Sequence, residues 1–104
     1  MTALETAIAA AHDELAGAAR SLDEAGRGRE AVVLRKAAKA IFVAIQGGAL
    51  GGERGSFVGG CAAAFGHAAD CARRARLVAC ATAWSRAARA LTTLAHALRD
   101  PSLR

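Results

Sequence analysis

The sequence has no tyrosine, a single proline (Pro101) and an aromatic content of only 4%. Residues with branched β-carbons, which favour strands, are also sparse. This shortage argues against a β-sheet protein. What the chain has in quantity is alanine, the strongest helix former, at 30 of 104 residues. We therefore predict an all-α fold, and the length suits one domain spanning residues 1–104.

Segments that would direct the chain to or across a membrane are also missing. Asp13 and Glu14 interrupt the apolar N-terminal stretch, which lacks the basic start of a signal peptide. No apolar run approaches the ~20 residues needed to span a bilayer. Cys61, Cys71 and Cys80 are odd in number and lie in helix-like sequence, so we interpret them as reduced thiols. These features predict a cytoplasmic protein with no membrane partner.

Charge is distributed unevenly along the chain. Residues 1–56 hold seven basic and seven acidic side chains, whereas residues 57–104 hold seven arginines against Asp70 and Asp100. The net charge of +5 therefore lies wholly in the second half. A basic half is typical of a surface for nucleic acid or for an acidic partner, and also of an ordinary solvated face.

Helix signals appear early in the sequence. Thr2 and Glu5 form a capping box, which opens a helix. Apolar residues then recur at spacings of three and four, and Gly26 and Gly28 predict where that helix ends. A second helix follows, and a third is expected to begin after a glycine-rich stretch, with Ser56 as its N-cap.

The second half of the chain carries two apolar seams, which are out of phase by ~200° at 100° per residue. One straight helix cannot direct both seams to one core, so we predict a break within residues 74–81. If these helices were continuous instead, an intertwined dimer would be the better model. The predicted fold is an antiparallel up-down four-helix bundle, with helices at about residues 2–25, 30–46, 57–74 and 79–99.

The stretch GGALGGERGS, residues 47–56, contains five glycines. A phosphate-binding P-loop follows a strand and places a lysine after its last glycine. Here no strand is expected, and the residue after Gly52 is Glu53. We interpret the stretch as a flexible linker between the two halves of the bundle.

His67 and Cys71 are the one pair of side chains with metal-ligand spacing. They are four residues apart and could share an ion on one helix face. A structural zinc site needs four ligands, however, and no second pair completes one. No nucleophile with a base and no paired carboxylates can be assigned either. We predict a non-enzymatic protein with no catalytic residues, no metal and no cofactor.

Residues 41–45 (IFVAI) are apolar on every side of a helical turn. Either this is a well-buried helix end, or part of its surface is left for a partner, because a helix in a small bundle cannot bury all its faces. We predict a groove for a helical partner between this segment and two phenylalanines beyond the linker. The predicted groove residues are Ile41, Phe42, Val43, Ile45, Phe57 and Phe65. The arginines predicted to steer acidic segments of the partner are Arg73, Arg74 and Arg76.

The chain also resembles the flagellin-specific export chaperones of bacteria (the FliS family). Residues 25–26 (AG) match the family's Ala-Gly turn, residues 40–45 the end of its second helix, and residues 51–53 (GGE) its loop. Residues 65–67 (FGH) stand where the family has Tyr-Asp-Tyr. The resemblance covers roughly residues 22–98 and is one of spacing more than identity.

The resemblance implies a cytoplasmic chaperone without ATP, which holds an amphipathic flagellin-like client until export. The apolar segment independently favours a helical protein-binding module, either a chaperone or a small adaptor. A second hypothesis is a basic nucleic-acid binder, although the chain has few aromatics for stacking and no helix-turn-helix signature. A third is a structural bundle that self-associates, for example as a homodimer, through the same apolar surface.

Overall fold

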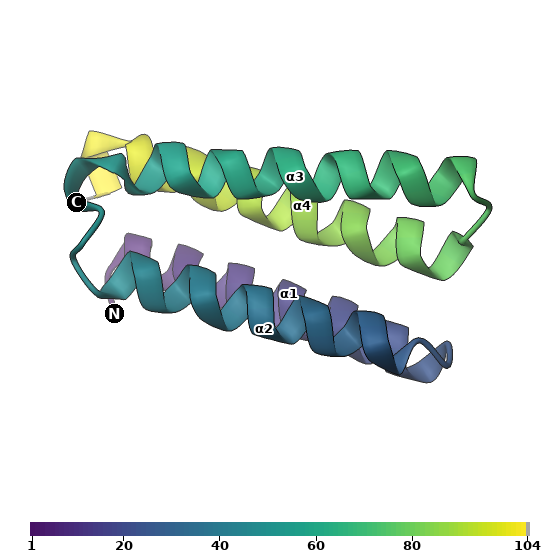
Figure 1. The fold of residues 1–104 in the computed structure, drawn as a ribbon. Coiled ribbons are helices and arrows are strands. Elements are labelled where there is room, and N and C mark those ends of the chain that lie inside the picture. Colours follow the sequence, from purple (N-terminus) through teal and green to yellow (C-terminus); the bar gives the residue numbers. More distant parts are fainter. Residues whose placement is uncertain (104) are drawn as a thin grey trace.

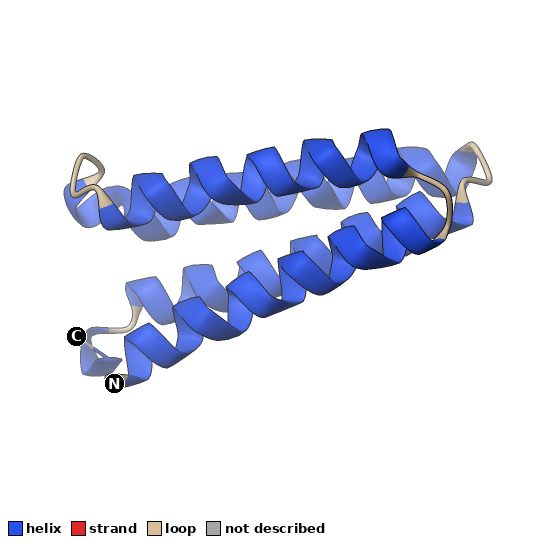
Figure 2. Cartoon of the chain, turned by 90° about the horizontal axis from the view of Figure 1, so that it is seen from below, coloured by secondary structure: helices blue, strands red, loops and turns tan. Residues whose placement is uncertain are grey.

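Four helices make up most of the protein in a computed structural model, which describes residues 1–103 (Figure 1). No strand occurs in this described part (Figure 2). The predicted all-α four-helix bundle is confirmed, and successive helices run in opposite directions. The helices are α1 (Ala3–Glu24), α2 (Gly28–Gln46), α3 (Arg54–Arg74) and α4 (Val78–Arg99), with 3-10 turns at Gly51–Glu53 and Pro101–Leu103.

The bundle consists of two hairpins, α1 with α2 and α3 with α4, which pack together through α1 and α4. Both hairpin turns lie at one end of the bundle, and both termini and the α2–α3 loop lie at the other (Figure 1). α4 packs most extensively against α3 and also against α1, whereas α2 packs mainly on α1. The backbones of α2 and α3 hardly approach each other. Of the four helices, α2 therefore makes the fewest close backbone approaches to its neighbours.

The predicted capping box at the start of α1 is confirmed. The Thr2 hydroxyl accepts a hydrogen bond from the Glu5 amide at 3.0 Å, and the Glu5 carboxylate accepts one from the Thr2 amide at 3.2 Å. The predicted break between the last two helices is also confirmed, and it falls at residues 75–77. The alternative prediction, one continuous helix through residues 57–99, is therefore wrong. The amide of Leu77 donates to the carbonyl of Ala72 at 2.9 Å, which closes a Schellman turn and ends α3.

The two hairpins turn in the same way. In the α1–α2 turn, Arg27 donates its amide to the carbonyl of Leu22 at 2.8 Å, the counterpart of the bond at the end of α3. The left-handed position is held by Gly26 (φ 76°) in the first turn and by Arg76 (φ 60°) in the second. Within residues 1–103, Arg76 is the one non-glycine residue with positive φ. A glycine at that position would have marked the break in the sequence.

An internal repeat underlies this similarity. Residues 36–41 read KAAKAI and residues 86–91 read RAARAL, so a basic, alanine-rich hexapeptide recurs 50 residues apart. The left-handed residues Gly26 and Arg76 are separated by the same 50 positions. This repeat was missed in the predictions from the sequence. It would have predicted two equivalent helical hairpins directly.

Two predicted helix boundaries are wrong. Ser56 is not an N-cap, because α3 already begins at Arg54, directly after the 3-10 turn. The glycine-rich stretch 47–56 is therefore partly helical rather than wholly a linker. Gly28 does not end α1 but is the first residue of α2. In both places the chain re-enters a helix sooner than the glycines suggested.

Leucines from three helices fill the centre of the bundle, surrounded by alanines. Alanine lets the helix axes approach, so a few large side chains supply most of the buried apolar area. None of the charged or polar side chains in residues 1–103 is buried. No helix in this part of the chain is both long and apolar enough to cross a bilayer. The leucines that are almost completely enclosed are Leu15, Leu22, Leu34, Leu91 and Leu94.

Candidate functional site

The structure separates the six residues that were predicted to form a groove. Ile41, Phe42 and Ile45 are buried, with exposed fractions of 5%, 7% and 2%. The expectation that they present surplus apolar surface is wrong, because α2 directs them into the common core of the bundle. The alternative, a well-buried helix end, describes this segment better.

The other three predicted groove residues differ from one another. Val43 is 59% exposed and Phe57 is 36% exposed. Phe65 is partly buried against the core, and its ring lies 5.7 Å from that of Trp84. Val43 lies on α2 and the phenylalanines on α3, two helices whose backbones hardly approach. The six residues therefore do not share one exposed surface.

A different surface on α2 combines apolar and basic side chains. Val32, Lys36, Lys39 and Val43 are all exposed, and we call them the α2 stripe. Their spacings of four, three and four place them within about 60° of one another around the helix. The two valines expose 47% and 59% of their surface. The stripe thus has apolar anchors near both ends of α2 and positive charge between them.

The basic side chains of the α2 stripe have no acidic partner. Lys36 and Lys39 form no ion pair within residues 1–103. The nearby acids are engaged elsewhere, since Asp23 pairs with Arg35 and Glu30 lies 3.5 Å from the Arg27 guanidinium. The stripe therefore carries uncompensated positive charge. Of these four residues, only Val43 was predicted as a contact residue, although the helical spacing of all four is visible in the sequence.

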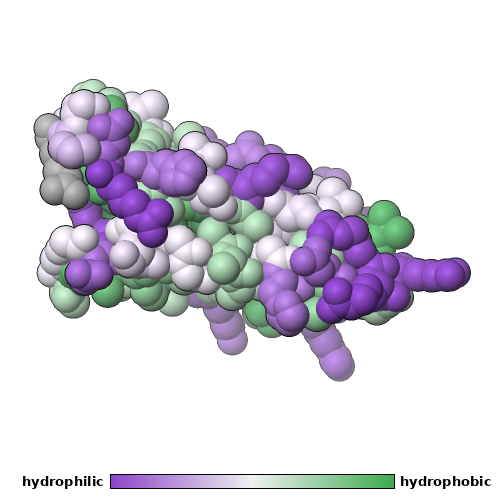
Figure 3. Space-filling view, turned by 90° about the horizontal axis from the view of Figure 1, so that it is seen from above, coloured by the Kyte–Doolittle hydropathy of each residue, from purple (hydrophilic) through white to green (hydrophobic). Residues whose placement is uncertain are grey.

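The α3–α4 turn carries the second candidate site, an open groove with a volume of about 610 Å³. Hydrophilic side chains gather at the end of the bundle where this turn lies (Figure 3). Of the three predicted steering arginines, Arg73 and Arg76 line the groove and Arg74 does not, whereas Arg89 had not been predicted. We call it the arginine groove, and its lining residues are Arg73, Arg76, Val78, Ala81, Thr82, Ser85 and Arg89.

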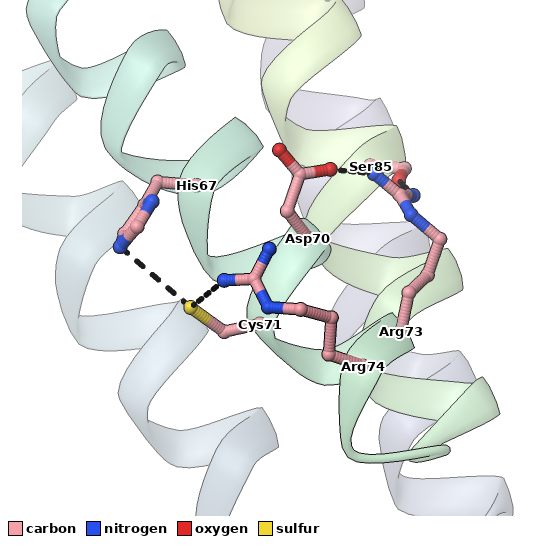
Figure 4. Close-up of polar contacts among 6 residues, drawn as sticks. All are labelled: His67, Asp70, Cys71, Arg73, Arg74 and Ser85. Carbon is pink, nitrogen blue, oxygen red and sulfur yellow. Dashed lines mark hydrogen bonds and ion pairs between the residues drawn. The ribbon is translucent and has the colours of Figure 1, made fainter.

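The arginines of this groove differ in their partners. Arg73 pairs with Asp70 and donates a hydrogen bond to the Ser85 hydroxyl at 3.1 Å, which links α3 to α4 (Figure 4). Arg76 and Arg89 form no ion pair within residues 1–103. No carboxylate is among the residues that line the groove. Two guanidinium groups are therefore available to an anion.

Cys71 is exposed near the C-terminal end of α3, on a different side of the helix from Arg73 and Ser85 (Figure 4). Its sulfur lies 3.6 Å from His67 Nε2 and accepts from the Arg74 guanidinium at 3.4 Å. His67 and Cys71 thus meet, as their spacing suggested, but they provide only two metal donors. No group of three or more His, Cys, Asp or Glu side chains suited to a metal occurs in residues 1–103. The other thiols are Cys61, whose pKa is raised by burial, and the buried Cys80.

An ion pair joins the two hairpins at the middle of the bundle. The Arg86 guanidinium donates to the Glu14 carboxylate at 2.8 Å and lies against Gly17, where a Cβ atom would come within 2.5 Å of it. This hydrogen bond and the charge of Arg86 lower the pKa of Glu14, and the charge of Arg89 adds to the effect. The same hydrogen bond raises the pKa of Arg86. This pair has a clear structural role, since it connects α1 to α4.

Neither candidate site contains a nucleophile with an oriented base, and both consist of surfaces suited to binding. The α2 stripe offers valine anchors among lysines, and the arginine groove offers guanidinium and hydroxyl groups. No family model, curated protein or solved structure matches this chain. The case for a function therefore depends on the geometry of these two surfaces.

Proposed function

We propose that this protein is a non-enzymatic helical bundle that binds an acidic amphipathic helix of another protein along the α2 stripe. The observation that supports this most directly is the stripe itself, two exposed valines at i and i+11 with two unpaired lysines between them. Helices dock into such surfaces through apolar residues spaced three and four apart. α2 has room for a partner because it packs mainly on α1.

Charge favours an acidic partner over a second copy of this chain. Two α2 stripes placed face to face would bring Lys36 and Lys39 of both copies together, and like charges in contact repel. A partner helix with glutamates or aspartates beside its apolar seam would instead pair with these lysines. Exposed pairs of this kind contribute little affinity but speed association and select the partner.

The resemblance to flagellin-specific export chaperones suggests a sharper form of this proposal. In that form, the partner is an amphipathic helix of a flagellin-like filament subunit, held until export. The revised contact residues are then Val32, Lys36, Lys39 and Val43. The buried residues Ile41, Phe42 and Ile45 would contribute to the stability of α2 and not to client contact.

The test compares two substitutions on the same helix. Val43→Asp and Val33→Asp both alter a valine that is 59% exposed, but Val33 lies about 80° from Val43 around the helix, outside the stripe. The probe is a fluorescein-labelled synthetic helix with leucines at heptad a and d positions and glutamates beside them, followed by fluorescence anisotropy. We expect Val43→Asp to weaken binding at least tenfold and Val33→Asp to change it less than twofold. Circular dichroism should show unchanged helix content for both variants.

Two further measurements separate the versions of the proposal. A purified flagellin subunit should bind the wild-type protein and not Val43→Asp; binding of the synthetic helix alone would disprove the flagellin form and leave the general one standing. Sedimentation velocity over a range of concentrations tests self-association. A wild-type dimer that becomes monomeric in Val43→Asp would show that a second copy occupies the stripe, and the client proposal would be wrong.

A further inference from the structure

We propose that the arginine groove binds a small polyphosphorylated molecule. This site lies on the second hairpin and is separate from the α2 stripe, so it does not depend on the function proposed above. Its ligand would contact Arg76 and Arg89 through its phosphate groups and the hydroxyls of Thr82 and Ser85 through hydrogen bonds. The charge of the groove, the backbone conformation of Arg76 and the size of the groove support this ligand.

The charge of the groove is positive and not neutralised from within. Arg76 and Arg89 have no ion-pair partner in residues 1–103, and no acid lines the groove. α4 begins beside the groove with no side-chain cap and no acidic residue in its first turn. The free amides and the dipole of a helix N-terminus add to the attraction for an anion. Guanidinium groups bind phosphate oxygens with paired, charge-assisted hydrogen bonds.

The backbone at Arg76 supports a role for this side chain. Arg76 adopts φ 60°, a left-handed conformation that costs an L-residue with a Cβ more than it costs glycine. The equivalent position of the first hairpin is Gly26, which adopts the same turn without that cost. An unfavourable backbone conformation that persists at a surface position is a sign of a functional constraint. The turn therefore holds an arginine side chain, and not a glycine, at the edge of the groove.

Size and composition favour a small ligand over a nucleic acid. The groove volume of about 610 Å³ falls in the range typical of small-molecule sites. From Val78 to Arg89 the groove follows α4 for about 16.5 Å, at 1.5 Å per residue, which is longer than a single phosphate group. Proteins that bind single-stranded nucleic acids usually combine a basic groove with aromatic side chains that stack on the bases. Trp84 and Phe65 of this hairpin pack against each other, and no aromatic side chain lines the groove.

The first hairpin provides a natural negative control, because its corresponding surface has a different charge. Where the second hairpin has Arg73, the first has Asp23, and where it has Ser85 the first has Arg35. In the first hairpin these two residues neutralise each other as an ion pair. Arg20 is exposed on α1 of the first hairpin, lies in neither candidate site and forms no ion pair in residues 1–103, so Arg20→Gln removes one positive charge from this hairpin alone.

The experiment is isothermal titration calorimetry with sodium tripolyphosphate at 150 mM KCl. We expect Arg76→Gly and Arg89→Gln each to weaken binding about tenfold, which corresponds to the loss of one charge-assisted contact. Arg20→Gln should change the affinity less than twofold. Because Arg76→Gly also relieves the left-handed strain, its thermal midpoint should rise, so lost binding could not be attributed to unfolding. In NMR spectra, tripolyphosphate should shift the amide signals of Thr82 and Ser85.

Three results would overturn the proposal. The first is no measurable binding of tripolyphosphate to the wild-type protein. The second is an equal loss of affinity in Arg20→Gln and Arg89→Gln, since binding would then reflect overall charge and not this groove. The third is binding of a single-stranded oligonucleotide without binding of tripolyphosphate, which would identify the basic end as a nucleic-acid surface.

Discussion

The two hairpins of this protein have similar backbones and different surfaces. Both turn through a Schellman motif with a left-handed residue, and both carry the repeated hexapeptide at residues 36–41 and 86–91. At the turns, however, Asp23 and Glu24 of the first hairpin correspond to Arg73 and Arg74 of the second. The two hairpins therefore share a backbone conformation, while the chemistry of their surfaces differs.

The hairpins also differ in how tightly their helices pack. α3 lies closer along α4 than α2 does along α1, and glycines on α3 make this approach possible. The stem of Arg99 lies across Gly55, where a Cβ atom would come within 2.5 Å of it. On its other side, α4 places Arg86 over Gly17 of α1. α4 is therefore the central helix, and α2 is the one most open to a partner.

The difference in packing predicts the largest mutational effect. Leu91→Ala and Ile41→Ala alter equivalent positions of the two hairpins, and both residues are buried. Core truncations of this kind cost roughly 2–5 kcal/mol of unfolding free energy. We expect Leu91→Ala to lie near the top of that range, because α4 packs against two helices, and Ile41→Ala near the bottom. Urea denaturation measures both. Equal losses would contradict the view that α4 is the central helix.

The two turns predict opposite effects of smaller size. Arg76→Gly should raise the unfolding free energy by about 1 kcal/mol, because glycine adopts positive φ without steric cost. Gly26→Ala should lower it by about 1 kcal/mol for the same reason. Gly28→Ala is the control, since Gly28 has no positive φ and no neighbouring atom within 4 Å of an added Cβ. A stabilising effect of Gly26→Ala in thermal denaturation would show that the turns are not equivalent.

The ion pair between the hairpins predicts a weaker, pH-dependent effect. Arg86 lowers the pKa of Glu14, so this carboxylate stabilises the fold above its ordinary pKa and loses that contribution as pH falls through the lowered value. Glu14→Gln should therefore be less stable than the wild type at neutral pH and equally stable in acid. Glu24→Gln is the matched control, because the exposed Glu24 carboxylate on the same helix forms no ion pair within residues 1–103. A difference between Glu14→Gln and the wild type that stayed constant down to low pH would argue against the ion pair.

All three cysteines lie in the second hairpin. Their rates of reaction should report on how well each part of that hairpin is enclosed. Timed alkylation with iodoacetamide, followed by peptide mass spectrometry, should label exposed Cys71 first and buried Cys80 last. Cys61 should react at an intermediate rate, because burial raises its pKa and reduces the thiolate that reacts. Rapid labelling of Cys80 would indicate that α4 is not enclosed as described.

Local signals in the sequence were sufficient for the fold class and for several boundaries. The capping box at Thr2 and Glu5 involves residues three apart, so it could be recognised without tertiary information. The phase difference between the last two apolar seams predicted the break before α4. It did so although Arg76 occupies the left-handed position of the turn, where a glycine is more usual. The repeat of residues 36–41 at 86–91 was equally visible and would have predicted the paired hairpins.

Tertiary packing alone decided which apolar residues remain exposed. Residues 41–45 are apolar on all sides, so periodicity could not distinguish a docking face from a core face. The structure buries Ile41, Phe42 and Ile45 and exposes Val43, because α2 packs on one side only. In the same way, Arg89 joins Arg76 at one groove across α3 and α4, although 13 positions separate them in the sequence. The sequence by itself determined the helices and the spacing of the α2 stripe, because both depend on near neighbours. Only packing between distant residues decided that the stripe stays exposed and that the arginine groove forms between α3 and α4.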